Sequence, residues 1–250
     1  MKGMVILRQL ILFVALLMFL AGCTQAIFPT TALPPDPTLE ELISLYRKQR
    51  EEIPPLKGLM KVTITDNGNK GFWAKWRSYD GVIQVDGYDL LGRTLFNLKV
   101  AGEEFSLVSP ENNFNGNREA LEQYLIAHDS EIRIEWVTLL DWIARGGLPD
   151  LSTSMHPTLR KDVGSDGNGY FVLSFAEQDI FLDRKSLRTK TVFFNNSDRF
   201  IGMTFNDYRS IGNIFFPFSI HTEVHDIRKG SRQDSIDMEI VFKEVKVITE

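Results

Sequence analysis

Hydrophobic residues recur along this chain at two different periods, and the first is helical. Leu39, Leu42 and Tyr46 fall on one face of a helix. Thr38 precedes them and Glu41 follows it by three residues, which is the capping-box spacing at a helix start. Two consecutive prolines then predict that this helix ends near residue 52. We interpret it as an amphipathic helix packed on a sheet; the alternative, binding to a membrane surface, is disfavoured by its acidic residues.

From Leu56 onward the period changes to two, which is typical of β-strands with one buried face. Short turns rich in Asp, Asn and Gly separate the segments, so we expect antiparallel pairing rather than a parallel α/β sheet. Pro217 inside one segment indicates a sheet edge or a bulge. The predicted strands number about eleven: Leu56–Thr65, Gly71–Ser78, Val82–Tyr88, Thr94–Ala101, Glu104–Ser109, Tyr170–Ala176, Asp179–Leu182, Thr189–Asn195, Phe200–Tyr208, Ile214–His225 and Ser235–Val247.

Two further helices are predicted between the two runs of strands. Asn117 is placed to cap a helix over Arg118–Ala127, and a second helix spans roughly Arg133–Arg145. Gly146-Gly147 then ends this second helix. The apolar side of each helix needs a partner, and the sheet is the partner available. The chain is therefore predicted to be mainly β with helices, an α+β fold.

The N-terminus has the pattern of an export signal. Two basic residues precede the apolar run Leu10–Leu20, which is too short to span a membrane as a helix. The run closes on Leu20-Ala21-Gly22-Cys23, which resembles a bacterial lipobox, and Cys23 is the one cysteine in the chain. The resemblance implies a diacylglyceryl thioether on Cys23, cleavage before it, and palmitate or another acyl chain on its amine. An ordinary signal peptide with a chance cysteine is the alternative.

Composition limits the partners of the mature chain. Removal of residues 1–22 takes away two basic and no acidic residues and leaves 26 basic and 33 acidic side chains, a formal charge of −7. That balance argues against nucleic acid as a partner and against a polybasic membrane patch. Residues 24–37 contain four prolines and read as a tether. We therefore expect a signal peptide over 1–22, a lipidated N-terminus and tether over 23–37, and one domain over 38–250.

Three local motifs, in order, resemble the LolA/LolB superfamily. Tyr88–Thr94 is similar to the segment where a strand reaches a "P-L-G" loop and returns. Leu140–Pro149 is similar to the "W-I/L-x-G-x-P" end of the inserted helix, with one extra residue, and Phe181–Leu187 to the "L-D-P-x-T-L" hairpin. The resemblance covers about residues 38–247. It implies an unclosed antiparallel β-barrel covered by an N-terminal helix and a helical insert.

The resemblance also implies a function, which is the noncovalent binding of lipid or lipoprotein acyl chains in an apolar half-barrel. It implies a chaperone-like, LolB-like receptor for lipoprotein localisation or lipid transport, with a LolA-like periplasmic carrier as partner. Leu91, with Leu90 beside it, matches the loop leucine that contacts the membrane; the alternative is that both leucines cap the core. The candidate cavity-lining residues are Phe72, Trp76, Phe96, Leu98, Phe171, Leu173, Phe216 and Phe218.

No pattern in the sequence indicates catalysis, a metal or a cofactor. His221 and His225 share a strand face, but four residues in a strand separate them by about 13 Å, too far for one zinc ion. The Asp/Asn/Gly-rich stretch 162–169 fails the EF-hand spacing, and G-x-S-x-G is absent. We therefore expect a non-enzymatic protein; a noncatalytic envelope scaffold with the same fold is the alternative function. Thr24 after the lipidated cysteine is not the aspartate of inner-membrane retention, so we expect the outer membrane, facing the periplasm.

Overall fold

The computed structural model describes residues 37–65, 68–111, 113–127, 135–148, 157–163, 169–195, 199–226 and 235–249. These residues belong to one compact unit, Pro37–Glu250, and Met1–Asp36 forms a separate unit. The strands before the helical insert are β1 (Leu56–Thr65), β2 (Asn69–Tyr79), β3 (Val82–Tyr88), β4 (Thr94–Ala101), β5 (Glu104–Val108) and β6 (Asn113–Gly116). Those after it are β7 (Thr158–Val163), β8 (Gly169–Ser174), β9 (Gln178–Asp183), β10 (Thr189–Asn195), β11 (Arg199–Ile211), β12 (Ile214–Asp226) and β13 (Ser235–Val247).

In the described part of the chain, all thirteen strands form one antiparallel sheet with the order β6-β5-β4-β3-β2-β1-β13-β12-β11-β10-β9-β8-β7. Each half is a meander of consecutive hairpins, and the two halves meet where β1 pairs with β13, from Leu56↔Val247 to Thr65↔Asp237. The end strands β6 and β7 do not pair with one another, so the sheet is unclosed. The predicted fold class, an unclosed antiparallel sheet with helices, is confirmed.

Two helices of the described residues, α2 (Leu39–Glu51) and α3 (Arg118–Ala127), begin at the caps that the sequence predicts. The predicted start of the third, near Arg133, lies outside the described residues. In α2, the Glu41 N–H donates to Thr38 Oγ1 over 3.2 Å, and the Thr38 N–H donates to Glu41 Oε2 over 2.8 Å. In α3, the Ala120 N–H donates to Asn117 Oδ1 over 3.0 Å. These bonds satisfy backbone donors that a helix start otherwise leaves without partners.

The end of α4 (Glu135–Ala144) also follows its glycines. The Gly147 N–H donates to the carbonyl of Trp142 over 2.7 Å, and the Gly146 N–H donates to that of Ile143 over 3.2 Å. Gly146 has a φ of 67°, the left-handed conformation that this type of helix end requires and that glycine adopts without a Cβ clash.

Two strands, β6 and β7, are absent from the eleven predicted ones. They are the edges of the sheet, and each lacks the clean alternation of buried and exposed side chains that a covered strand shows. Pro217 is explained by a local edge. The pairing of β12 with β13 begins at Ser219, so at Pro217 the strand has only β11 as a neighbour, and the missing N–H breaks no ladder bond on the open side.

The sheet curves strongly toward one face. The rings of Trp76 on β2 and Phe216 on β12 stack with centroids 5.7 Å apart, although β1 and β13 lie between their strands. In a flat sheet the two backbones would be about 14 Å apart, at roughly 4.8 Å per strand. Gly58 on β1 permits the contact, because a Cβ atom at this position would lie 2.8 Å from Trp76 Nε1.

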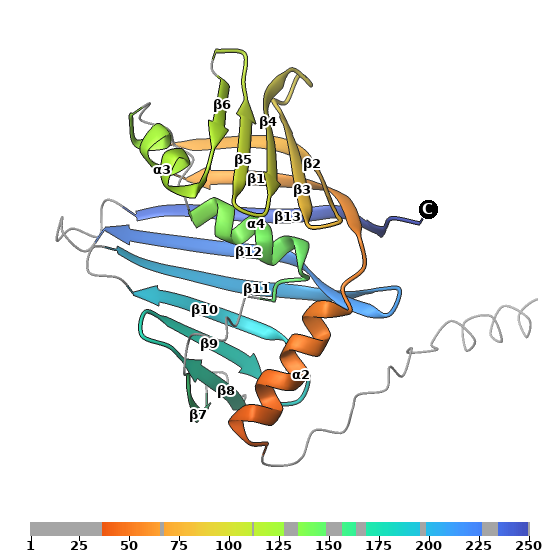
Figure 1. The fold of residues 1–250 in the computed structure, drawn as a ribbon, viewed down its shortest axis with the longest axis vertical. Coiled ribbons are helices and arrows are strands. Elements are labelled where there is room, and N and C mark those ends of the chain that lie inside the picture. Colours follow the sequence, from red (N-terminus) through yellow and green to blue (C-terminus); the bar gives the residue numbers. More distant parts are fainter. Residues whose placement is uncertain are drawn as a thin grey trace, which may run out of the picture. The chain divides into compact units, whose positions relative to one another are not determined.

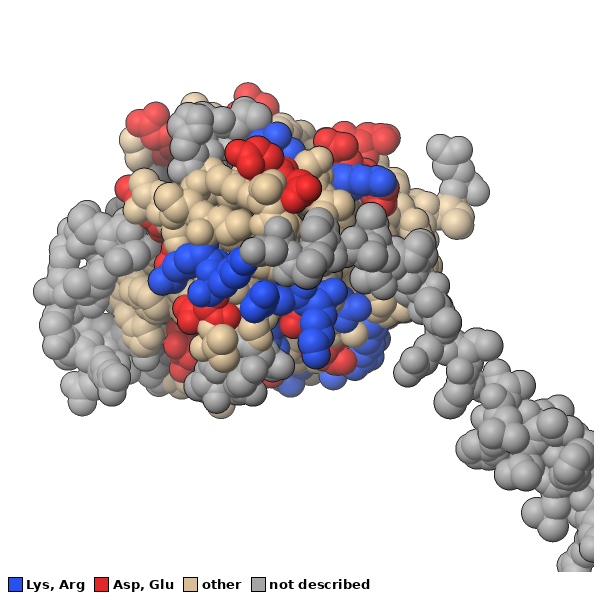
Figure 2. Space-filling model, turned by 90° about the horizontal axis from the view of Figure 1, so that it is seen from below, with Lys and Arg blue, Asp and Glu red and all other residues tan. Residues whose placement is uncertain are grey.

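Helices α2 and α4 lie across one face of the sheet (Figure 1). Trp142 of α4 contacts the ring of Phe205 on β11, and Tyr46 of α2 lies 3.4 Å from Thr189 Oγ1 on β10, measured from its hydroxyl. Charged residues stay on the surface: in the view from below, Lys and Arg side chains form a band with Asp and Glu side chains among and beside them (Figure 2). The described helices are not long and apolar enough for any of them to cross a membrane.

Candidate functional site

The registers of the strands bring all eight predicted lining residues to one face of the sheet. Within the first half, Trp76 pairs with Val85 and Val85 with Leu98, and neighbours two positions away along a strand share its face. In the second half, an unbroken series of pairs joins Thr222, which shares its face with Ile220, through Met203, Val192 and Ile180 to Leu173. The two halves connect because Phe72 pairs with Val62, Val62 with Ile240 and Ile240 with Ile220. We call this surface the apolar face. It includes the buried side chains that point to the same side of the sheet as the eight candidates, which are Phe72, Trp76, Phe96, Leu98, Phe171, Leu173, Phe216 and Phe218.

An aromatic cluster occupies the region where the two halves of the sheet meet. Trp76 stacks on Phe216, and Phe242 of β13 meets both rings edge-on, at 6.0 and 4.9 Å between centroids. Phe218 extends the cluster along β12 with an edge contact of 6.1 Å to Phe216. All four side chains are buried. These rings supply most of the apolar surface at the centre of the site.

The other lining residues lie on either side of this cluster. Phe72 and Phe96 contact one another edge-on at 5.6 Å and are only half-buried. Leu98, Phe171 and Leu173 are buried, and the Arg184 guanidinium lies 5.3 Å from the centre of the Phe171 ring. Partial exposure makes Phe72 and Phe96 the lining residues most accessible from solvent.

The two helices that cover the apolar face are joined to one another by an ion pair. Arg50 Nη2 of α2 lies 2.7 Å from Asp141 Oδ2 of α4, and the Arg50 side chain is 19% exposed. Trp142, next to Asp141, stacks on Phe194 of β10 at 5.3 Å with the ring planes 18° apart. Sequence reasoning placed Trp142 in the Leu140–Pro149 motif but not among the lining residues. It assigned the helix one apolar stripe, whereas Leu139 to Ala144 are buried except for Asp141. The density of large apolar residues in this helix is the signal that could have revealed it.

Two polar atoms on the apolar face are buried without a hydrogen-bond partner. One is the indole Nε1 of Trp76 and the other is the hydroxyl of Thr222, in side chains that are each 3% exposed. Thr222 lies on β12 between Met203 and Met238 of the neighbouring strands, so it faces methionine side chains. A buried donor without an acceptor costs roughly 1–3 kcal/mol.

Under α2, a group of hydroxyls is fully hydrogen-bonded instead. Tyr208 Oη donates to the carbonyl of Thr189 over 2.7 Å, beside the Tyr46 hydroxyl. Burial raises the pKa of Tyr208 well above its ordinary value, and the proximity of Tyr46 adds to this rise. Tyr208 therefore stays protonated and acts as a donor that fixes the end of β10, not as a base.

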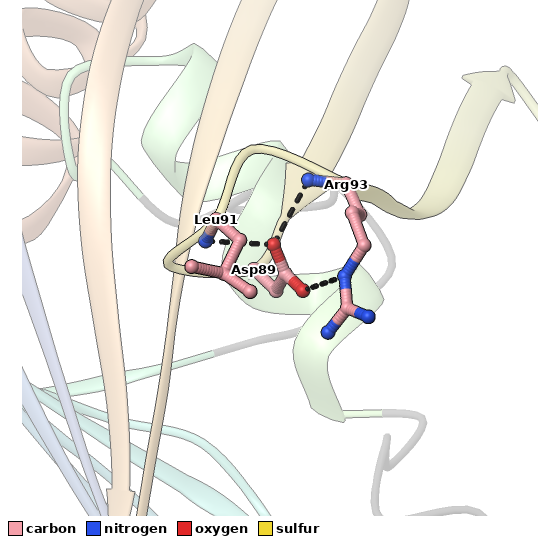
Figure 3. Close-up of polar contacts among 3 residues, drawn as sticks. All are labelled: Asp89, Leu91 and Arg93. Atoms are coloured by element: carbon pink, nitrogen blue, oxygen red, sulfur yellow. Dashed lines mark hydrogen bonds and ion pairs between the residues drawn. The ribbon is translucent and has the colours of Figure 1, made fainter.

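The β3–β4 loop exposes two leucines to solvent, and Figure 3 shows how Asp89 holds the turn through Leu91 and Arg93. Asp89 Oδ1 accepts hydrogen bonds from the N–H groups of Leu91 and Arg93 over 2.9 and 2.8 Å, and Asp89 Oδ2 lies 2.6 Å from Arg93 Nε. The turn closes through a bond from the Gly92 N–H to the carbonyl of Asp89 over 3.0 Å. Leu90 and Leu91 are 73% and 80% exposed. The alternative that these leucines cap the core is therefore wrong.

These hydrogen bonds also set the ionisation of the loop. The bond from the Arg93 backbone N–H is the largest cause of a lowered pKa at Asp89, and the Arg93 side chain and the Leu91 N–H lower it further. Asp89 is thus a carboxylate at neutral pH. Cys23 and the predicted tether lie outside the described residues, apart from Pro37, so their roles stay predictions.

Comparison with known proteins supports the fold through structure, not sequence. No model of a known protein family matches the chain, and no curated protein matches it. A domain from Vibrio parahaemolyticus provisionally named an outer membrane lipoprotein-sorting protein domain superposes with a TM-score of 0.60 at 12% identity, over 84% of this chain and 92% of that one. A LolA superfamily protein from Nitrosomonas europaea gives a TM-score of 0.56 at 11% identity, over 86% and 96%. A DUF1329 family protein from Desulfovibrio piger gives 0.52 at 9% identity, over 84% and 92%.

These three structures define the class to which the fold belongs. The fold of this chain, an unclosed antiparallel sheet with helices across one face, superposes on each of them over most of both chains. The protein therefore has a LolA/LolB-like fold, as the three sequence motifs predicted.

Proposed function

We propose that this protein is a lipid-anchored receptor or carrier that binds the acyl chains of lipids or lipoproteins noncovalently on its apolar face. The observation that carries the proposal is the apolar face itself, which runs across both halves of an unclosed sheet and is covered by two helices. An acyl chain gains about 0.8 kcal/mol for each methylene that it buries, so an acylated protein needs such a shelter to cross water. The names of two structural neighbours, a lipoprotein-sorting protein domain and a LolA superfamily protein, support the same function.

The β3–β4 loop supports a role at the membrane within this proposal. Two exposed leucines on a fixed turn gain roughly 1–2 kcal/mol each in an apolar medium, enough for reversible contact but not for anchoring. Anchoring is the proposed role of the lipid on Cys23. We propose that Leu91 and Leu90 contact the outer membrane from the periplasmic side while an acyl chain passes to or from the apolar face, and that a LolA-like carrier delivers it.

The test is lipid extraction from the native, gently purified protein followed by mass spectrometry, together with binding of a fluorescent acyl probe. Phe72→Glu and Trp73→Glu make a matched pair, since neighbouring residues of β2 point to opposite faces and both are half-buried. We expect Phe72→Glu to weaken probe binding at least tenfold and Trp73→Glu to leave it within about twofold.

Two results would count against acyl binding. One is wild-type protein that carries no lipid beyond its own anchor and does not bind the probe. The other is an equal loss of probe binding in Phe72→Glu and Trp73→Glu. If protein partners were co-purified from such lipid-free material, the envelope-scaffold function would be favoured instead.

A further inference from the structure

A cluster of metal-ligating side chains lies on the opposite face of the sheet from the apolar face. His221, Glu223 and His225 alternate on β12 with the buried residues Ile220 and Thr222, so they point outward. Asp237 of β13 pairs directly with Glu223 across the two strands. The long-range pairing of β12 with β13 therefore brings a carboxylate to histidines that the sequence places 12 to 16 residues away.

The geometry of three of these residues suits one cation. His221 Nε2 lies 3.1 Å from Glu223 Oε1, and one ligand atom from each of His221, Glu223 and Asp237 lies within 4.8 Å of the others. Ligands around a tetrahedral zinc ion are about 3.3 Å apart, given metal–ligand distances near 2.0–2.1 Å. The His221 and Glu223 side chains are 42% and 49% exposed, so small rotations can close the remaining distance.

The charges of the cluster are a second, independent indication of a cation. Glu223 and Asp237 are like charges directly opposite one another, an arrangement that destabilises a sheet. Glu239, opposite His221, adds a third carboxylate. Among the described residues, no Lys or Arg forms an ion pair with Glu223 or Asp237, and Glu223 contacts His221 and His225 instead. From β11, the residues opposite His221 and Glu223 are the uncharged Thr204 and Gly202.

We propose that His221, Glu223 and Asp237 bind a divalent transition-metal cation of the zinc class. One imidazole nitrogen and two carboxylate oxygens suit zinc and neighbouring first-row metals, whereas an all-oxygen set would favour magnesium or calcium. Three protein ligands leave at least one position for water or for a donor atom from a partner. His225 is not part of the group: its Nε2 lies 3.7 Å from Glu223 Oε2, and its ring packs against Phe200.

His225 provides a matched control, because it has the same side chain, strand and face as His221 and also contacts Glu223. The experiment is isothermal titration of Zn²⁺ alone into the tag-free, full mature protein in detergent, with circular dichroism to verify folding. We expect one Zn²⁺ per wild-type chain, at least tenfold weaker binding in His221→Ala and Asp237→Asn, and a change below twofold in His225→Ala.

Titration with Co²⁺ keeps the proposal testable if a variant folds poorly. Cobalt d–d absorption bands should appear on wild-type protein and on His225→Ala and should be lost from Glu223→Gln. The proposal is overturned if wild-type protein binds no Zn²⁺, if His221→Ala binds as tightly as wild type, or if His225→Ala loses as much affinity as His221→Ala.

Discussion

At the scale of single residues, the apolar face contains polar atoms in two opposite situations. The Thr222 hydroxyl is buried without a partner, whereas Thr189, which is fully buried, has its hydroxyl beside that of Tyr46 and its carbonyl bonded to Tyr208. The same residue type therefore contributes to stability with opposite signs at the two positions.

Replacement of each threonine by valine tests this difference. Thr222→Val keeps the shape and removes an unsatisfied hydroxyl, so the free energy of unfolding should rise by about 1 kcal/mol. Thr189→Val removes a hydrogen-bonding group and should lower the free energy of unfolding by roughly 0.5–1.5 kcal/mol. Urea denaturation of both variants measures the change, and a loss of stability in Thr222→Val would contradict the assignment.

Asp89 gives the loop a defined dependence on pH. The pKa of Asp89 is lowered in the folded protein. Its ionised carboxylate therefore contributes fully to the free energy of unfolding above the unfolded-state pKa of about 3.9. That contribution is lost as the pH falls through the lower pKa of the folded state. Asp89→Ala should therefore lower the urea midpoint relative to wild type equally at pH 5 and pH 8. The difference between the two proteins should shrink below pH 4; a difference that changed between pH 5 and 8 would point to another titrating group.

At the scale of elements, the β3–β4 loop and the helix pair each have a separable role. In the loop, Asp89 holds the turn while Leu91 faces solvent, so Leu91 can change without cost to the fold. In the helix pair, Arg50 and Asp141 connect α2 to α4 above the apolar face. Access to the face should depend on this connection, because a ligand has to pass the helices that cover it.

Leu91→Glu should weaken the contact with membranes without a change in stability. Loss of an exposed leucine contact of roughly 1–2 kcal/mol corresponds to about a tenfold lower partition into liposomes. Flotation of the unit Pro37–Glu250 with liposomes measures this partition. Val163→Glu is the control, because Val163 is 66% exposed but lies on the edge strand β7; equal losses would assign the effect to charge alone.

Asp141→Asn should speed the entry of an acyl probe to the apolar face. The Arg50–Asp141 pair is partly exposed, so its removal should cost at most about 1 kcal/mol of stability. Stopped-flow fluorescence of probe uptake reports the rate. Glu52→Gln is the control, since Glu52, the C-cap of α2, forms a 4.0 Å exposed pair with Lys48 of the same helix and does not connect α2 to α4. An unchanged rate of probe uptake in Asp141→Asn would show that the helices do not limit access.

At the scale of the whole molecule, the aromatic cluster holds the two halves of the sheet together. Phe216 is completely buried and contacts Trp76 and Phe242, which also contact one another. Its position explains why a meander of hairpins becomes one curved body with a continuous inner face. Stability should therefore depend on this cluster more than on aromatic residues of the outer face.

Phe216→Ala should lower the free energy of unfolding by about 3–5 kcal/mol, the range for a large buried aromatic. Phe193, which is half-buried and stacks on Phe200 on the outer face, is the comparison. Phe193→Ala should cost clearly less, and urea denaturation compares the two. Equal decreases in the free energy of unfolding would mean that the cluster stabilises the fold no more than an aromatic contact on the outer face does.

Much of this architecture could be predicted because one side of most strands is buried. Alternation then fixes both the strand and the face, and the eight candidate residues do lie on one face of the sheet. That they line a ligand cavity stays a prediction. The edge strands β6 and β7 were not predicted, because an edge strand is only partly covered and its sequence then lacks a regular alternation of buried and exposed residues. The Arg50–Asp141 pair and the Glu223–Asp237 pair could not be predicted, because each depends on which distant elements meet. For Leu90 and Leu91 the sequence left two alternatives open, and the structure decides for exposure because Asp89 holds the turn that carries them.

The pairing of β1 with β13 has a consequence for biogenesis. Leu56 and Val247 are partners although almost the whole domain separates them in sequence, so this pairing forms only after β13 has been synthesised. Contacts of such long range make folding slow. If the chain is exported, as its N-terminal pattern predicts, the two halves of the sheet would join only after β13 has left the channel.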